Sequence, residues 1–379
     1  DPPDVPPAKI AYLIPAYLNN EADILDDTIS AYCNLAYSGE ILVLVVFNSK
    51  GDISETESNL ASRWHGVVRG QSGNIRISIV KNDDSKSKAE NVNFGLSLIH
   101  SDVDYTAIMD ADHQPSPRSA SVATGILQSK GYDILQGACT IRNQDNFLSR
   151  MVSVEFEHMY CVAHPGRFWV FDLALFVGSN GYWKSSVLRE IGMDKSMLTE
   201  DVDSSFRAVL AGYKIGHSID VVSSELSPVS PSVLQKQRLR WGQGWAEVTY
   251  KHFRECITSS HLSPRQKLAI VHVLGWREIL PYITFWPLWC LLAGVFQVGS
   301  VEFVPSWTAV LGSVLFVFGI ARVAAAYALS RGPIGHSIGA FVLFSVWGML
   351  FDVYLSYLQV VAHGRCLLKA NEWIATVRE

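Results

Sequence analysis

Short unbroken apolar runs alternate with helix-like patterns through the first third of the chain. The runs have the length and β-branched content of buried strands: Lys9–Pro15, Ile41–Phe47, Ile75–Val80 and Tyr105–Met109. Apolar residues at helical spacing lie between them, over Glu21–Tyr37, Ser54–Trp64 and Ser87–Ile99. Because strands that are apolar on both faces need helices on both sides, the pattern predicts an α/β fold built on a mostly parallel sheet.

Polar residues gather where three of these strands end, at Pro15–Glu21, Asn48–Gly51 and Asp110–His113. Ligands of open α/β sheets bind at the carboxyl ends of the strands, so a nucleotide-sized ligand is expected at this edge. The later elements expected in this part of the chain are a strand at Asp133–Cys139 and helices at Phe147–Cys161, Asp201–Leu210 and Val233–Lys251.

The last third of the chain is strongly apolar. Its charge-free segments are Ile279–Val301, Phe303–Ala321 and Gly332–Phe351. Each approaches the roughly 20 apolar residues that span a bilayer, so two to three transmembrane helices are predicted. Leu268–Tyr282 keeps two charges among apolar residues and is expected to lie at the membrane interface. The alternative is a buried helical domain of a soluble protein.

Composition supports this division and excludes other classes of protein. We expect an α/β domain over residues 8–262, the interfacial and transmembrane helices over 263–365, and a tail over 366–379. The net charge of −5 and the absence of a basic block in the sequence argue against a nucleic-acid partner. The six cysteines are scattered without CxxC or zinc-ligand spacing, so reduced thiols are expected rather than a disulfide framework.

Asp110 and Asp112 flank an alanine just past a predicted strand. In an extended chain these side chains point the same way, so both carboxylates can face one ligand. Two oxygen donors suit Mg²⁺ or Mn²⁺, and His113 could add a nitrogen ligand that favours Mn²⁺. The alternative is an ordinary solvated loop.

Thr199, Glu200 and Asp201 stand at the start of a predicted helix. Asp201 is the candidate general base, which would take the proton of an acceptor hydroxyl as its oxygen attacks an anomeric carbon. A single displacement of this kind inverts the anomeric configuration. The alternative is plain helix capping, with Thr199 as the N-cap and the two acids complementing the helix dipole.

Gln237, Arg240 and Trp241 lie within about one turn of a predicted helix, and Trp245 follows one turn later. Arginine suits bidentate contact with a diphosphate, and tryptophan offers a flat face to a sugar. An interfacial anchor is the competing interpretation. Lys88 opens another helix and could serve phosphates, although a plain polar helix start is an equal alternative.

With these residues, the chain resembles glycosyltransferase family 2, in its membrane-integrated, cellulose-synthase-like branch. The motifs that carry the resemblance are Ile14-Pro15-Ala16-Tyr17 with Glu21, Lys88–Asn93, Asp110–His113, Gly178-Ser179, Thr199–Asp201 and Gln237–Trp241. The resemblance implies a Rossmann-like GT-A fold, a UDP-sugar donor, Mg²⁺ or Mn²⁺, and Asp201 as the base. One departure is Asn48, because the family usually has an acidic residue after the second strand to bind the base or ribose.

The resemblance and the residue chemistry together define the expected site. Nucleotide-sugar binding is expected from Pro15, Tyr17, Glu21, Asn48, Lys88, Asp110, Gln237, Arg240 and Trp241. Acceptor binding is expected from Gly178, Ser179, Asn180, Glu200, Trp241 and Trp245. The metal is expected at Asp112 and His113.

The leading hypothesis is an inverting transferase that adds a hexose from a UDP-sugar to a growing β-glycan. The alternative is a lipid glucosyltransferase that adds one sugar to diacylglycerol or ceramide, and a third class is a non-catalytic membrane scaffold. The expected setting is an integral membrane protein with a cytosolic catalytic domain. Membrane lipids, a glycan or lipid acceptor, and an oligomeric or accessory subunit are the expected partners.

Overall fold

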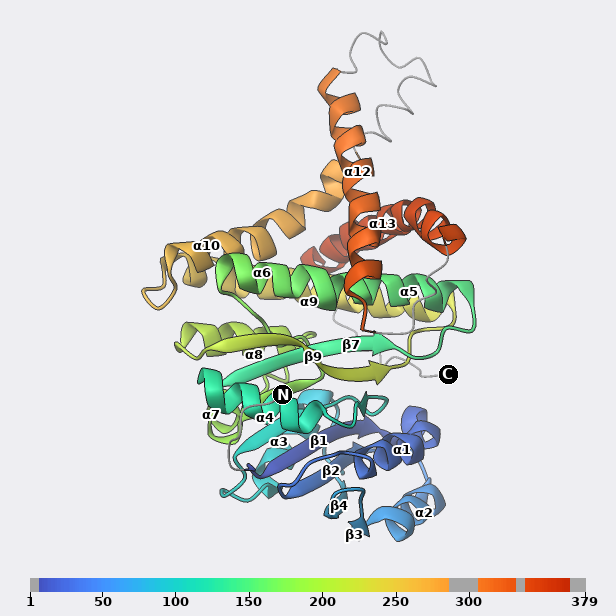
Figure 1. Ribbon diagram of the computed structural model, residues 1–379, viewed down its shortest axis with the longest axis vertical. Helices are drawn as coiled ribbons and strands as arrows, with labels where there is room; N and C mark the ends of the chain where they lie inside the picture. The colour runs from blue at the N-terminus through green and yellow to red at the C-terminus, as the bar shows by residue number, and fades with distance from the viewer. Residues whose placement is uncertain (1–6, 286–305, 332–337, 369–379) are drawn as a thin grey trace.

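The computed structural model describes residues 7–285, 306–331 and 338–368. The strands within these ranges are β1 (Ile10–Tyr17), β2 (Ile41–Asn48), β3 (Gly66–Arg69), β4 (Asn74–Lys81), β5 (Tyr105–Ile108), β6 (Gln114–Pro115), β7 (Ile134–Ile141), β8 (Gly181–Lys184) and β9 (Ile215–Glu225). They form a nine-stranded mixed sheet in the order β3-β4-β2-β1-β5-β8-β7-β9-β6. Figure 1 shows this sheet below the helices of the C-terminal part.

Helices cover the sheet and continue beyond it. Those of the α/β part are α1 (Leu18–Cys33), α2 (Ser54–Trp64), α3 (Lys88–Leu98), α4 (Ser119–Lys130), α7 (Ser185–Ile191) and α8 (Glu200–Leu210). Those above it are α5 (Phe147–His158), the π-helix η1 (Met159–Ala163), α6 (His164–Phe171), α9 (Pro231–Thr258), α10 (Pro264–Ile270), the π-helix η2 (Val271–Trp276), α12 (Ser306–Leu329) and α13 (Ile338–Leu367).

The first half of the sheet follows the prediction. β1 pairs in parallel with β2 and β5, and β2 pairs in parallel with β4. Successive residues of β1 face opposite sides: Leu13 packs into one apolar core with α3 and α8, while Tyr12 and Ile14 pack into the other with α1 and α4. Both faces are therefore buried, which is why the strands are continuously apolar.

The second half of the sheet is where the sequence was least informative. β8 runs antiparallel between β5 and β7. The sequence analysis did not predict β9 or the short strands β3 and β6. β9 mixes serine, histidine and aspartate with few apolar residues, so it lacks the apolar run that indicates a strand. Backbone pairing with β7 makes this segment a strand, although its side-chain pattern does not indicate one.

Asn180 closes the irregular junction of β7 and β9. The β7–β9 register shifts between Gly137 and Ala138. Asn180, at a positive φ of 51°, donates through Nδ2 to the carbonyls of Ala138 and Val221, each at 2.9 Å. The side chain is fully buried, so its amide holds two strands together at the bulge.

A buried carboxylate fastens α8 to α9. Asp203 accepts from His252 at 2.8 Å and from Lys251 at 2.7 Å, and it also pairs with Arg207 of its own helix. These partners, outweighing burial, lower its pKa. Two of the three partners come from α9, so these pairs hold α8 against α9.

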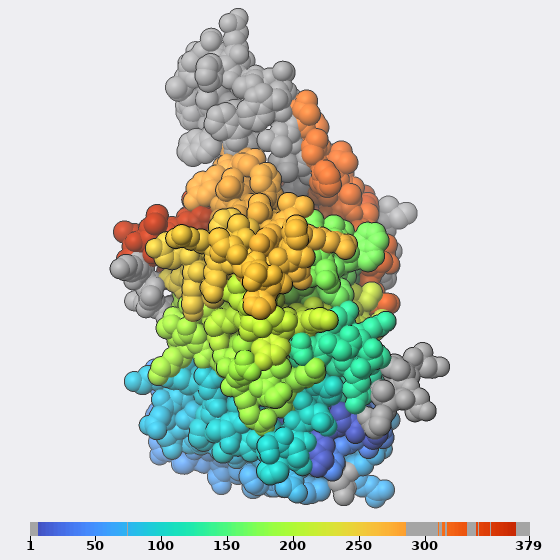
Figure 2. All heavy atoms as spheres, turned by 90° about the vertical axis from the view of Figure 1, so that its left-hand side faces the viewer, coloured from blue at the N-terminus to red at the C-terminus, as the bar shows by residue number. Residues whose placement is uncertain are grey.

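The C-terminal helices pack on the helices above the sheet: α13 and α10 contact α9, and α12 contacts α5 and η1. α13 packs along α9, α10 lies obliquely across α6 and α9, and α12 projects away from the sheet (Figure 1). In the space-filling view α12 extends beyond the yellow and orange layer formed by α9 and α10 (Figure 2).

Two helices among the described residues are long and apolar enough to cross a membrane: Pro264–Phe285 and Phe341–Leu367. The first contains the segment expected at the interface, and it packs on α6 and α9 rather than standing apart from them. The expected span Ile279–Val301 and the tail 366–379 lie largely outside the described residues.

We predict that Asn180→Ala destabilises the protein by about 2–4 kcal/mol, because two buried carbonyls lose their donors and alanine must adopt a positive φ. Thermal unfolding of the purified protein measures the effect. An unchanged melting temperature together with a raised KM for the acceptor would instead support the acceptor-binding role expected from the sequence.

Candidate active site

A cavity of about 220 Å³ lies at the carboxyl edge of the parallel strands, beneath α9. It brings together most of the residues expected from the sequence: Pro15, Tyr17, Glu21, Asn48, Lys88, Asp110, His113, Gly178, Ser179, Glu200, Asp201, Gln237, Arg240, Trp241 and Trp245. Asp112 and Asn180 do not line it. Segments far apart in the sequence meet here because the parallel strands end at one edge.

The end of β1 and the start of α1 form one wall of the cavity. The backbone N–H of Tyr17 donates to Glu21 Oε2 at 2.8 Å, so the carboxylate caps the start of α1 while facing the cavity. Beside it, Asn91 Nδ2 donates to Asn48 Oδ1 at 2.9 Å. Asn48 is thereby held in place at the cavity by a residue of α3.

Lys88 is the electrostatic centre of the cavity. Its ammonium forms an ion pair with Asp110 and donates to the Gly178 carbonyl at 2.8 Å. Burial alone would lower the pKa of Lys88, but Asp110, Glu200 and Asp201 outweigh burial and raise it to about 12. The lysine is therefore a permanent positive charge facing the place where a diphosphate is expected.

The two acids at the start of α8 lie side by side, Glu200 buried and Asp201 half-buried. Burial and the charge of Asp201 raise the pKa of Glu200 to about 7, against the opposing charge of Lys88. Burial likewise raises the pKa of Asp201, and Lys88 opposes that rise. An aspartate with a raised pKa is a better proton acceptor near neutral pH than an exposed one. Thr199 holds the N-cap position without a side-chain capping bond, so capping does not explain this motif.

The turn before β8 lies directly against Asp201. Gly178 has a φ of +99°, and a Cβ at this position would lie 2.9 Å from Asp201 Oδ2. Ser179 Oγ accepts from the Asp110 backbone N–H at 2.9 Å. Gln136, fully buried on β7, donates to the Ser179 carbonyl and accepts from Val177, which fixes the turn. Sequence analysis missed Gln136 because no motif marks it.

The metal corner combines oxygen and nitrogen donors. Ligand atoms of Asp110, Asp112 and His113 lie within 4.8 Å of one another. Asp112 is fully buried, and its Oδ2 accepts from the Leu226 backbone N–H at 3.0 Å, so it stands behind the cavity wall. This set of donors fits a divalent cation such as Mg²⁺ or Mn²⁺.

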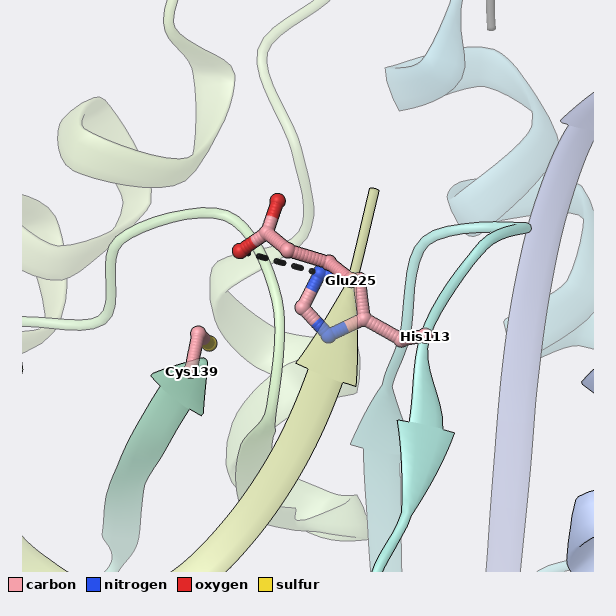
Figure 3. A group of neighbouring side chains, drawn as sticks. All are labelled: His113, Cys139 and Glu225. Atoms are coloured by element: carbon pink, nitrogen blue, oxygen red, sulfur yellow. Dashed lines mark ion pairs between the residues drawn. The ribbon is translucent and has the colours of Figure 1, made fainter. Parts of the chain in front are cut away.

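Glu225 joins this corner and was missed from the sequence. It ends β9, lines the cavity, and its Oε1 lies 3.6 Å from His113 Nε2 (Figure 3). His113 Nδ1 is hydrogen-bonded to Ser223 Oγ at 2.9 Å, whereas Nε2 is buried with no hydrogen-bond partner among the described residues. An imidazole whose one nitrogen is hydrogen-bonded and whose other nitrogen is not is suited to bind a metal through the second nitrogen. Only the unpredicted strand β9 brings Glu225 here.

Helix α9 lays an arginine, an amide and two indoles along the cavity. Gln237 lines the cavity and is 6% exposed, and its Oε1 is buried without a hydrogen-bond partner among the described residues. Arg240 donates to the Leu198 carbonyl at 3.4 Å. A Cβ at Gly244 would lie 2.5 Å from Thr199 Cγ2, so glycine lets α9 approach the start of α8 closely.

Each indole of this wall is backed by an arginine. The Arg238 guanidinium lies 4.3 Å from the Trp241 ring and pairs with Glu155 of α5 at 2.7 Å. The Arg277 guanidinium lies 4.5 Å from the Trp245 ring. Such cation–π contacts hold the flat faces of the indoles in fixed orientations, as sugar stacking requires.

Helices α5, η1 and α6 add side chains that sequence analysis left open. Phe156, Met159, Tyr160 and His164 line the cavity on the side of Trp241. Burial lowers the pKa of His164, so its imidazole is neutral. The π-helical turn that directs these residues inward breaks the 3.6-residue period, which is why periodicity alone did not find them.

Two family models match the chain. The model described as "Glycosyl transferase family group 2" matches residues 105–328, more than half of the chain, and "Glycosyl transferase family 2" matches residues 12–192. The chain belongs to glycosyl transferase family group 2. The membership expected from the motifs is thereby confirmed.

Curated relatives agree at low identity. Glucomannan 4-beta-mannosyltransferase 7 of Arabidopsis thaliana is 27% identical over 308 residues, which cover 78% of this chain and 53% of the relative. Poly-beta-1,6-N-acetyl-D-glucosamine synthase of Staphylococcus aureus (strain MW2) is 25% identical over 252 residues, covering 64% and 56% respectively. The chain thus spans little more than half the length of these two relatives.

The fold has a solved counterpart. A mannosyltransferase from Pyrobaculum calidifontis, in complex with GDP-Man and Mn²⁺, superimposes with a TM-score of 0.56 at 16% sequence identity. The match covers 98% of this chain and 92% of that one. The predicted GT-A architecture is confirmed, with a sheet that is more mixed than expected.

We predict that Gly178→Ala lowers kcat/KM at least about 10-fold, because the added methyl displaces the Asp201 carboxylate. The matched control is Gly131→Ala, which has a similar positive φ of +67° but open space around the new Cβ. Steady-state kinetics of both variants separate displacement of Asp201 from backbone strain. Equal losses in the two variants would contradict the prediction.

We predict that Lys88→Gln moves the acidic limb of the kcat/KM profile to higher pH by about one unit. Lys88 lowers the pKa of both acids at the start of α8, so losing its charge raises the pKa through which the base must ionise. Lys88→Arg keeps the charge and should keep the limb. An unmoved limb in Lys88→Gln would show that neither acid controls it.

Proposed function

We propose that the protein transfers a sugar from a nucleoside diphosphate sugar to a growing β-glycan, with inversion, at a membrane surface. The observation that carries the proposal is that a half-buried carboxylate, Asp201, lies between the wall that holds Lys88 and the aromatic wall of α9. The charge of Lys88 acts on Asp201 from the first wall. The close approach of Gly244 to Thr199 places the α9 wall, with Trp241 and Trp245, on the other side.

The residues divide the reaction between them. Asp201 accepts the proton of the acceptor hydroxyl, whose oxygen attacks the anomeric carbon from the face opposite the leaving diphosphate. Lys88 and Arg240 hold that diphosphate, and Gln237 accepts a hydrogen bond from the ligand. Trp241 and Trp245 stack the terminal acceptor sugar. A divalent cation held by Asp112 and His113, beside Asp110, would neutralise charge on the leaving diphosphate.

The donor and acceptor follow from the cavity and the relatives. The motifs favour a UDP-sugar, while the relatives named mannosyltransferases and the structural neighbour bound to GDP-Man make GDP-mannose the other candidate. The relatives named above make polymers rather than glycolipids, which favours the glycan acceptor over diacylglycerol or ceramide.

The membrane setting is part of the proposal. The two helices long and apolar enough to span a bilayer, together with the packing of α10 and α13 on α9, support an integral membrane protein. We propose that its catalytic part faces the cytosol. The cavity would then receive a soluble donor and deliver the elongated chain beside the bilayer.

We predict that membranes containing the protein incorporate label from UDP-glucose, UDP-N-acetylglucosamine or GDP-mannose into an insoluble, β-glycanase-sensitive polymer. Asp201→Asn should reduce incorporation about 10²- to 10⁴-fold while leaving nucleotide affinity unchanged, because only the proton acceptor is lost. The measurements are product analysis and nucleotide binding by calorimetry.

Other outcomes would redirect the assignment. An organic-soluble labelled product would support the lipid glucosyltransferase, and no incorporation from any donor would support a scaffold. Full activity in Asp201→Asn would remove Asp201 from the role of base.

A further inference from the structure

Three buried side chains of different chemistry converge at the ends of β7 and β9. Figure 3 shows His113, Cys139 and Glu225 pointing toward a common space. Their ligand atoms lie within 4.8 Å of one another, and His113 Nε2 is 3.6 Å from Glu225 Oε1. His113 and Cys139 are each 1% exposed and Glu225 is 8% exposed.

The surrounding structure leaves a nitrogen for a ligand here. Ser223 Oγ lies between two of the side chains, 2.9 Å from His113 Nδ1 and 3.9 Å from Cys139 Sγ. This contact orients the imidazole through Nδ1, whereas the buried Nε2 has no hydrogen-bond partner within the described part of the chain. Orientation of a histidine by its second nitrogen is typical of metal-binding imidazoles.

We propose that His113, Cys139 and Glu225 form a second cation site, specific for a thiophilic divalent ion such as Zn²⁺. One nitrogen, one sulfur and one oxygen donor, with water as the fourth ligand, make a zinc set, whereas Mg²⁺ avoids sulfur. Binding forms a metal–sulfur bond, and the thiol proton leaves to the solvent. The sequence spacing of the cysteines does not reveal this site because the fold, not a motif, assembles it.

The site excludes the catalytic cation. Both sites need His113 Nε2, and a single nitrogen lone pair binds one ion at a time. Zinc bound to Cys139 would therefore draw His113 and Glu225 away from the corner that serves the diphosphate. Inhibition by zinc rests on the proposed function, whereas zinc binding itself does not.

Binding is tested without any substrate. Cobalt(II) added to the purified, metal-free full chain should produce the near-ultraviolet charge-transfer band of a cobalt–thiolate bond, and Zn²⁺ should remove it. Cys139→Ser and Cys139→Ala should abolish the band. The matched control, Cys256→Ser, replaces another fully buried cysteine and should keep it. A missing band in the wild-type chain, or a band that survives in both Cys139 variants, overturns the proposal.

Inhibition is tested by titrating Zn²⁺ into the transferase assay at saturating Mn²⁺. The wild-type chain and Cys256→Ser should be inhibited at the same zinc concentration. Half-inhibition of Cys139→Ser should require a zinc concentration at least about 10-fold higher. Cys139 does not line the cavity, so its variants should keep the basal rate. Equal inhibition of all three overturns the regulatory role even if the cobalt band is present.

Discussion

The ammonium of Lys88 is the interaction on which the active site depends. It pairs with Asp110, binds the Gly178 carbonyl, and lies close enough to Glu200 and Asp201 to act on the pKa of both. Several carboxylates buried in one cavity would otherwise repel one another and take up protons. Burial raises the pKa of Glu200 and Asp201, and the positive charge of Lys88 limits that rise.

Helix α9 connects this electrostatic centre to the membrane helices. On one side Gly244 allows close contact with Thr199, and on the other Gly242 allows α13 to approach, where a Cβ would lie 2.8 Å from Gln359 Oε1. Gln359 also hydrogen-bonds Glu278 at 3.1 Å. The helix that carries Gln237, Arg240 and Trp241 is therefore held between the start of α8 and the apolar C-terminal helices, and the aromatic wall is positioned from both sides.

Prediction from sequence succeeded where one residue's chemistry and its place after a strand were sufficient. β1, β2, β4 and β5 were recognisable as apolar runs, and their ends delivered Tyr17, Asn48 and Asp110 to one cavity. It failed where pairing, not side-chain pattern, makes the strand. β9 has no apolar run, so neither the strand nor Glu225 at its end was foreseen.

The sequence by itself determined which residue types are available for the proposed reaction. They are a lysine, the paired aspartates, a candidate base and the indoles of α9, and each type suits one task. The tertiary structure decided which of these share a cavity and which serve the scaffold. Asn180, for which acceptor contact stays a prediction, donates to carbonyls of β7 and β9, and Asp112 stands behind the wall. Cys139 and Glu225 become candidate metal ligands only because the fold places them beside His113. The physical reason is that such contacts join residues far apart in the chain, and no local pattern records which strand ends will meet.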